Sequence, residues 1–123
     1  MFNFEKLEVW QKAIVFADLI YTETQAFPAE ERFGLTNQLR RAAVSNSSNI
    51  AEGPSRPSKN DFARFAEIAA GSLFEAVSQA FVARRQGFLS ENQFRKIYTG
   101  AEELSRMLSG LRKSLLSTLN SQL

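Results

Sequence analysis

Residues 36–53 read Thr36-Asn-Gln-Leu-Arg-Arg-Ala-Ala-Val-Ser-Asn-Ser-Ser-Asn-Ile-Ala-Glu-Gly53, and this stretch decides the fold. Its apolar residues return every three or four positions, which is the spacing of one face of an α-helix. Residues 45–49, all Ser or Asn, interrupt the pattern, although such side chains compete for backbone hydrogen bonds and weaken helix propensity. The stretch therefore predicts a helix with either a buried polar seam or a surface for a polar partner.

The ends of this helix have recognisable signals. Thr36 is a favourable N-cap residue, Gly53 suits a left-handed C-terminal cap, and Pro54 stops the helix. Asn46 occupies a position where the spacing calls for an apolar residue. The predicted buried face of this helix consists of Leu35, Leu39, Ala42, Ala43, Asn46 and Ile50.

Three further stretches show helical spacing. A first helix is expected over residues 7–24, ending before Phe27-Pro28, and Ser58 and Ser90 each open a capping box for a later helix. Gly87 separates these two later helices. The expected buried faces are Trp10, Ala13, Ile14, Ala17, Ile20 and Tyr21 in the first helix; Phe62, Phe65, Ala66, Ala69, Leu73, Val77 and Ala80 in the third; and Phe94, Ile97, Ala101, Leu104, Leu108, Leu111 and Leu115 in the fourth.

Four helices with short connections, and no strand-like alternation, predict an all-α protein. The expected architecture is an up-down antiparallel four-helix bundle that forms a single domain over residues 1–123. Eleven phenylalanines are many for one bundle interior, and several fall off or at the edge of the apolar faces: Phe16, Phe74, Phe81 and Phe88. We therefore expect some of these rings to contact another subunit of a homo-oligomer.

Composition excludes many kinds of catalysis. The 123 residues include no Cys and no His, so disulfides, thiolate metal sites and the Ser-His or Cys-His nucleophile systems are impossible. Carboxylate and arginine chemistry remains, with Glu52 and Glu75 as its candidates. We expect no catalytic residue, no metal, no cofactor and no enzyme activity. The absence of a signal-peptide layout and of a long apolar run predicts a cytoplasmic protein without a membrane segment.

Four polar side chains on adjoining helices have spacings that place them face to face: Asn49, Glu52, Ser72 and Glu75. They predict either a contact to a ligand or RNA, or a hydrogen-bonded seam that fixes the register of the two helices. We favour the seam.

Positive charge is unevenly distributed along the chain. The net charge is +2, but residues 1–35 carry three basic and six acidic side chains, and the rest carries twelve basic and seven acidic ones. Clustered cations at an end of the bundle can bind phosphates without reading bases. The candidate nucleic-acid-binding residues are Arg84, Arg85, Arg95 and Lys96, with Arg40, Arg41, Arg56 and Lys59 as further candidates. Adjacent helical residues point about 100° apart, so we expect different roles for Arg40 and Arg41.

The sequence resembles the small four-helix-bundle proteins encoded in intervening sequences of bacterial 23S ribosomal RNA genes. The resemblance rests on a few segments: Leu7-Glu-Val-Trp-Gln11, Phe27-Pro28, Phe33-Gly-Leu-Thr-Asn-Gln-Leu-Arg-Arg-Ala-Ala43, Ser45, Asn49-Ile-Ala-Glu-Gly53, Phe62, Phe65, Ala69-Ala-Gly-Ser72 and Glu75. The fourth helix matches by pattern only. Asn46-Ser47 stands where the family usually has Ile-Pro, which should straighten the second helix and alter the subunit interface.

This resemblance implies an up-down bundle that assembles as a ring-like homopentamer. It also implies kinship with the accessory variability proteins of diversity-generating retroelements, which bind a reverse transcriptase and nucleic acid through basic surfaces. The leading hypothesis is a non-enzymatic, homo-oligomeric RNA-associated accessory protein with structured RNA, and a protein such as a reverse transcriptase, as partners. The alternative is an oligomeric protein-interaction scaffold without affinity for nucleic acid.

Overall fold

The structure is a computed structural model that describes the backbone of residues 1–121 and the side chains of residues 1–117. Within this part of the chain every regular element is a helix. The four α-helices are α1 (Glu8–Thr24), α2 (Leu35–Glu52), α3 (Lys59–Arg85) and α4 (Glu91–Ser121). Three short 3₁₀ segments accompany them: η1 (Asn3–Lys6), η2 (Ala29–Glu31) and η3 (Gly53–Ser55).

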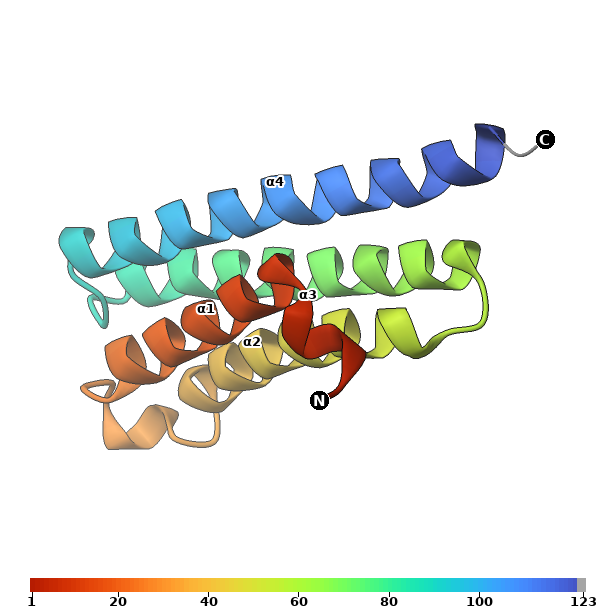
Figure 1. Ribbon diagram of the computed structural model, residues 1–123. Coiled ribbons are helices and arrows are strands. Elements are labelled where there is room, and N and C mark those ends of the chain that lie inside the picture. The colour runs from red at the N-terminus through yellow and green to blue at the C-terminus, as the bar shows by residue number, and fades with distance from the viewer. Residues whose placement is uncertain (122–123) are drawn as a thin grey trace.

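The helices run alternately up and down, as expected for an antiparallel bundle (Figure 1). The backbone of α2 lies close to α1 and α3, and that of α4 likewise lies close to α1 and α3, whereas the backbones of α1 and α3 are farther apart in the described residues. α1 and α3 therefore lie diagonally opposite. The turn that joins α3 to α4 lies at the left end of Figure 1, and the last turns of α4 project beyond α3 at the right.

The core is built largely from the faces that the spacing predicts, with one helix thinner than the others. All six predicted core positions of α2 are buried, including Asn46. α4 buries five of its predicted residues, from Phe94 to Leu108. α3 contributes mostly small side chains to the interior: Ala63, Ala66, Ala69, Leu73, Ala76, Ala80 and Ala83 are buried. These alanines let the neighbouring helices approach the α3 backbone closely.

α1 is rotated slightly from the orientation that the sequence predicts. Phe16, expected at the edge of the apolar face, is buried, whereas Ile14 and Tyr21, expected in the core, are exposed. The Phe16 ring packs beside Gly100 of α4, where a Cβ would lie 3.5 Å from Cδ1 of Phe16, which is an ordinary van der Waals contact.

The prediction that Thr36 caps α2 was wrong. The cap lies two residues earlier: the helix begins at Leu35, and the cap residue is Gly34, which has no side chain to accept a hydrogen bond. The Glu31 carboxylate of η2 replaces it, since Oε1 accepts the Leu35 backbone N–H at 3.1 Å. A negative charge also suits the N-terminal end of a helix.

The left-handed cap predicted at Gly53 was also wrong. Gly53 has φ −53° and ψ −53°, so the chain continues in a right-handed helical conformation into η3. A Cβ at this position would lie 2.5 Å from Cδ1 of Phe62. Gly53 is therefore required by the close approach of the Phe62 ring, not by its own backbone conformation.

The signals around α3 and α4 are confirmed. The Ser58 hydroxyl accepts the Asp61 backbone N–H at 3.1 Å at the start of α3. Gly87 follows the end of α3 with φ 81°, the only positive φ in the described backbone, which a glycine adopts without steric cost. Ser90 and Gln93 form both hydrogen bonds of a capping box, at 2.8 and 3.1 Å.

By length and composition alone, α3 could cross a membrane. A core helix of a soluble protein passes the same test, and α3 packs against α2 and α4 in the bundle. Only 28% of the most apolar 18-residue stretch of α3 is buried, however. The helix therefore presents apolar side chains on its outer face.

We expect Gly53→Ala to destabilise the fold by about 1–3 kcal/mol, because the added methyl group overlaps the Phe62 ring. Gly110→Ala is the matched control, since no atom lies within 4 Å of the position that its methyl group would occupy and Ala is the better helix former by about 0.8–1 kcal/mol. Urea unfolding of both variants measures the two effects. Equal stability of the two variants would contradict the packing role of Gly53.

Candidate nucleic-acid interface and inter-helix polar seam

The Ser and Asn residues of α2 form a polar seam against α3. The hydroxyls of Ser45 and Ser72 share a hydrogen bond with an oxygen–oxygen distance of 2.9 Å. The Asn49 amide donates to the Ser45 carbonyl at 2.8 Å and to its hydroxyl at 3.2 Å, so Asn49 supports the seam from within α2. The seam links the two helices at the level where both present small side chains.

Asn46 is the buried centre of this seam. Its side chain is fully buried, and Nδ2 donates to the Ala69 carbonyl of α3 at 2.8 Å. Oδ1 is buried without a hydrogen-bond partner. An unpaired buried polar atom costs about 1–3 kcal/mol, which offsets the gain of about 0.5–1.5 kcal/mol from the hydrogen bond. Asn46 therefore fixes the register of α2 on α3 more than it stabilises the fold.

Two of the four residues predicted for the seam lie outside it. Glu52 is exposed and forms an ion pair with Arg56 at 2.7 Å, one helical turn further along the chain. Glu75 is exposed and accepts a hydrogen bond from Gln79 of its own helix at 3.3 Å. These carboxylates do lie on adjoining helices, but Ser45 and Asn46 make the contacts that cross to α3.

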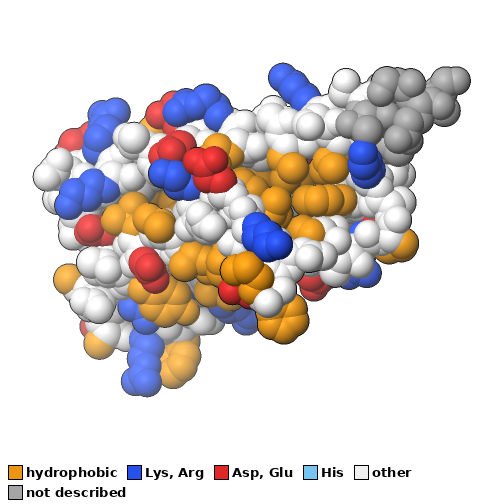
Figure 2. All heavy atoms as spheres, in the orientation of Figure 1, with side chains coloured by type: hydrophobic (Ala, Val, Ile, Leu, Met, Phe, Trp, Pro, Cys, Tyr) orange, Lys and Arg blue, Asp and Glu red, His pale blue; other side chains and the backbone are white. Residues whose placement is uncertain are grey.

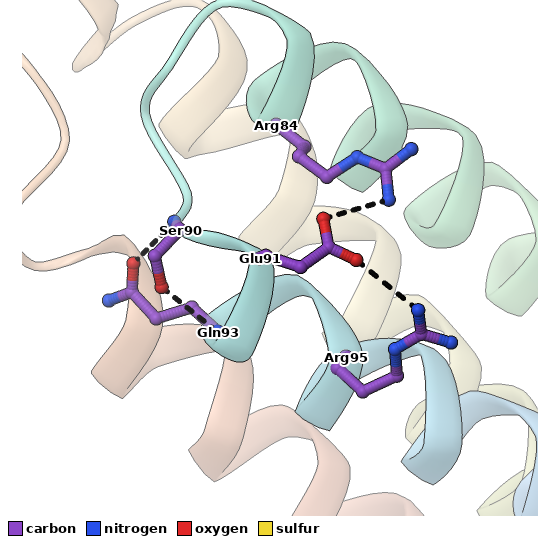
Figure 3. Close-up of polar contacts among 5 residues, drawn as sticks. All are labelled: Arg84, Ser90, Glu91, Gln93 and Arg95. Carbon is purple, nitrogen blue, oxygen red and sulfur yellow. Dashed lines mark hydrogen bonds and ion pairs between the residues drawn. The ribbon is translucent and has the colours of Figure 1, made fainter.

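The end of the bundle where α3 meets α4 holds the four leading candidates for phosphate contacts. Figure 3 shows Arg84 of α3 and Arg95 of α4 on either side of Glu91, the first residue of α4. The carboxylate of Glu91 pairs with Arg84 at 3.3 Å and with Arg95 at 3.2 Å. All of these groups are partly or largely exposed, so each pair contributes little to stability.

Aromatic rings hold Arg84 in place. Its guanidinium carbon lies 4.1 Å from the centroid of the Phe94 ring and 5.3 Å from that of Phe81. Phe81, Phe94 and Tyr98 also contact one another edge-on or tilted. Arg84 is therefore a fixed cation above an aromatic cluster that joins α3 to α4.

Arg85 and Lys96 are exposed, and neither belongs to an ion pair within the described side chains. Residues 84–96 carry four cations and one carboxylate, Glu91, which leaves a local net charge of +3. Figure 2 shows that basic and acidic side chains are interspersed near the start of α4 at the upper left, so this end is not a uniform positive field. Arg85 and Lys96 are its two available cations.

Arg40 has a structural role. Its Nε donates to Thr24 Oγ1 at 3.0 Å, and Nη2 donates to the Tyr21 carbonyl at 3.4 Å. The guanidinium carbon also lies 4.6 Å from the centroid of the Tyr21 ring. These contacts satisfy groups in the last turn of α1, so Arg40 joins the end of α1 to α2.

The other predicted cations differ in their exposure and in whether they form an ion pair. Arg41 is exposed and has no ion pair within the described side chains, which agrees with the separate roles expected for adjacent arginines. Arg56 pairs with Glu52 and lies 4.5 Å from the centroid of the Phe65 ring. Lys59 is exposed at the start of α3. The α2–α3 connection, near which Arg56 and Lys59 lie in sequence, is at the opposite end of the bundle from the α3–α4 turn (Figure 1).

A groove between α3 and α4 was not predicted from the sequence. Its volume is about 570 Å³, and its walls are mainly apolar: Leu73, Phe74, Val77, Phe81, Tyr98 and Ala101 line it, with Glu102 and Arg106 at its polar edge. Phe74 and Phe81 are two of the rings that the spacing places off the apolar faces. The groove itself depends on the distance between two helices, for which one sequence gives no signal.

The arrangement of the helices, the polar seam and the basic end are together those of a small four-helix-bundle protein. The described residues contain no cluster of three or more Asp, Glu, His or Cys side chains that could hold a metal ion. Residues 5–110 match the model of the 23S rRNA-intervening sequence protein family. The chain therefore belongs to that family.

Among solved structures, the chain is similar to a protein of unknown function from the S23 ribosomal protein family of Bacteroides thetaiotaomicron. The TM-score is 0.77 at 23% sequence identity, and the alignment covers 85% of this chain and 98% of the other. At this identity the likeness supports the fold. No curated protein matches the chain. Neither the family nor this neighbour indicates a catalytic activity.

Substitution of Asn46 tests the seam. We expect Asn46→Asp to destabilise the fold by about 3–5 kcal/mol, because it places an unpaired charge at a fully buried position. Asn46→Ile removes the unpaired oxygen as well as the hydrogen bond, so we expect its free energy of unfolding to lie within about 1 kcal/mol of wild type or above it. Denaturant titration measures both, and an Ile variant as unstable as the Asp variant would contradict the register role.

Proposed function

We propose that this chain is a non-enzymatic, homo-oligomeric protein that binds the phosphate backbone of structured RNA through the end where α3 meets α4. The observation that carries the proposal is the local charge of +3, in which Arg85 and Lys96 are exposed and have no ion pair among the described side chains. Lys and Arg contacts of this kind bind phosphates without reading sequence. The family name, 23S rRNA-intervening sequence protein, supports RNA as the partner. The proposal places the protein in the cytoplasm.

Symmetry would increase the affinity of this site. One subunit offers two available cations, and each phosphate contact contributes only a part of the binding free energy. A homo-oligomer repeats the same end several times on one particle, so that one RNA can contact several subunits at once. The exposed apolar side chains of α3 support self-association, since a monomeric soluble protein rarely exposes a large contiguous apolar patch. The homopentamer that the resemblance implies is part of this proposal.

Replacing the two available cations tests the RNA contact. We expect Arg85→Gln with Lys96→Gln to weaken binding to a labelled RNA hairpin and to lower the slope of log affinity against log salt by about 1.4–1.8, the release expected for two phosphates. Lys6→Gln with Lys113→Gln is the control, because both lysines are exposed and lie outside residues 84–96. Fluorescence anisotropy at several salt concentrations provides the measurement. An equal loss in both double variants would show that net charge, and not this end of the bundle, determines binding.

The shared carboxylate allows a test of the opposite sign. Glu91→Gln releases Arg84 and Arg95 from their ion pairs and raises the local charge from +3 to +4. We therefore expect tighter RNA binding and a steeper salt dependence than wild type in the same titration. Glu52→Gln is the matched control, since it releases Arg56 far along the chain from this end. Unchanged or weaker binding by Glu91→Gln would overturn the assignment of this surface.

The alternative function is an oligomeric protein-interaction scaffold that has no affinity for nucleic acid. The groove between α3 and α4 favours it, because the groove is mainly apolar and open to solvent. A partner protein, for example a reverse transcriptase, would then bind the oligomer directly. RNA titration separates the two functions, since the scaffold predicts no salt-dependent RNA binding even at low ionic strength.

A further inference from the structure

The groove between α3 and α4 has aromatic walls. Phe74 and Phe81 of α3 and Tyr98 of α4 line it, together with smaller apolar side chains. Phe74 and Phe81 are seven residues apart, so their side chains leave α3 within about 20° of each other. Phe74 is 60% exposed and contacts no other ring in the described part of the chain. Its ring is therefore available to a flat aromatic ligand in the groove.

The polar side chains of the groove have no partner within the protein. They are Ser78, Tyr98, Glu102, Ser105 and Arg106. None of them forms a hydrogen bond or an ion pair within the described residues. Ligand sites combine mainly apolar walls with a few convergent polar groups, in volumes of about 300–1,000 Å³. At about 570 Å³, the groove has both the size and the chemistry of such a site.

The charges around the groove differ along its length. Glu102 and Arg106 both lie at its polar edge, so their charges offset each other there. At the basic end, the guanidinium carbon of Arg84 lies 5.3 Å from the centroid of the Phe81 ring. Phe81 therefore belongs both to the groove and to the aromatic cluster that holds Arg84. A ligand that spans the two places needs an uncharged aromatic part for the groove and an anionic part for the basic end.

Unpaired RNA has this division of chemistry. Its bases are flat, uncharged and aromatic, and in loops and single strands they are free to stack on aromatic side chains. We propose that an unpaired base of RNA enters the groove between α3 and α4 and stacks against Phe74, while the adjoining phosphates lie on the basic end. The Glu102 carboxylate can accept a hydrogen bond from an amino group of that base.

This inference rests on the RNA binding of the proposed function and specifies the class of RNA. A hairpin loop, a bulge or a single strand can supply the base, whereas the bases of a continuous duplex are already paired and stacked. The site also leaves part of α3 for self-association. Ile68 and Val82 do not line the groove and lie about 120° and 80° around the helix from Phe74.

Two substitutions of Phe74 separate base stacking from apolar packing. Phe74→Leu keeps an apolar side chain without the ring, whereas Phe74→Tyr keeps the ring. We expect Phe74→Leu to weaken binding to a labelled RNA hairpin with an unpaired loop at least about fivefold, and Phe74→Tyr to bind like wild type. The slope of log affinity against log salt should stay unchanged in both, because stacking neutralises no phosphate. Fluorescence anisotropy at several salt concentrations measures affinity and slope.

A blunt RNA duplex with the same number of phosphates is the control ligand, since it offers only its backbone. We expect wild type to prefer the hairpin over the duplex at least about fivefold, and Phe74→Leu to bind the two equally. A change in fold or in oligomeric state affects both RNAs alike, so the ratio of the two affinities isolates the base contact. Phe33→Leu is the control variant, because Phe33 is 85% exposed and lies outside the groove.

The outcomes distinguish this inference from the function on which it rests. A Phe74→Leu variant that keeps the wild-type preference for the hairpin overturns the base site, and so does a wild-type protein that binds hairpin and duplex equally. In both cases the phosphate contacts of the proposed function stand. Wild-type protein that binds neither RNA at low salt overturns the proposed function and this inference with it.

Discussion

Close packing against the alanine side of α3 is the constraint on which the rest of the structure depends. Six of the seven buried residues of α3 are alanines, and α3 contacts both α2 and α4. Large side chains on the neighbours, such as Leu39 and Leu104, are buried in the same core cluster as the alanines of α3. The same close approach brings Asn46 within 2.8 Å of the Ala69 carbonyl. A larger residue at Ala69 or Ala76 would move α2 or α4 outward and separate the groups of the polar seam.

Much of the fold could be predicted because periodicity determines which face of a helix is buried. The buried positions of α2 and most of those of α4 follow from spacing alone, and so do the caps at Ser58 and Ser90. Errors arise where a residue outside the helix, or in another helix, decides the outcome. Glu31 replaces the expected cap at Thr36, and the Phe62 ring explains Gly53. Such contacts have no signal within the local sequence window.

The sequence predicts where the cations of the candidate site lie, but not which of them are held in ion pairs or hydrogen bonds. The spacing of residues 84–96 around a turn indicates that cations of two helices meet at one end of the bundle. Which cations remain available depends on side-chain geometry: Glu91 is placed to pair with both Arg84 and Arg95, and Arg40 reaches the end of α1. Spacing also cannot distinguish Ser45 and Asn46, which form hydrogen bonds between α2 and α3, from Glu52 and Glu75, whose partners in the structure lie close by in sequence.

The short turn between α3 and α4 has a consequence for how the chain folds. Gly87 and the Ser90–Gln93 capping box direct the chain straight back, so that near this turn α3 and α4 pack through contacts between residues close in sequence. Contacts of this kind require little loop-closure entropy, and helical bundles rich in them fold within microseconds to milliseconds. The α3–α4 hairpin can therefore form early and provide the surface on which the earlier helices assemble. Its basic end would already be in place before α1 completes the core.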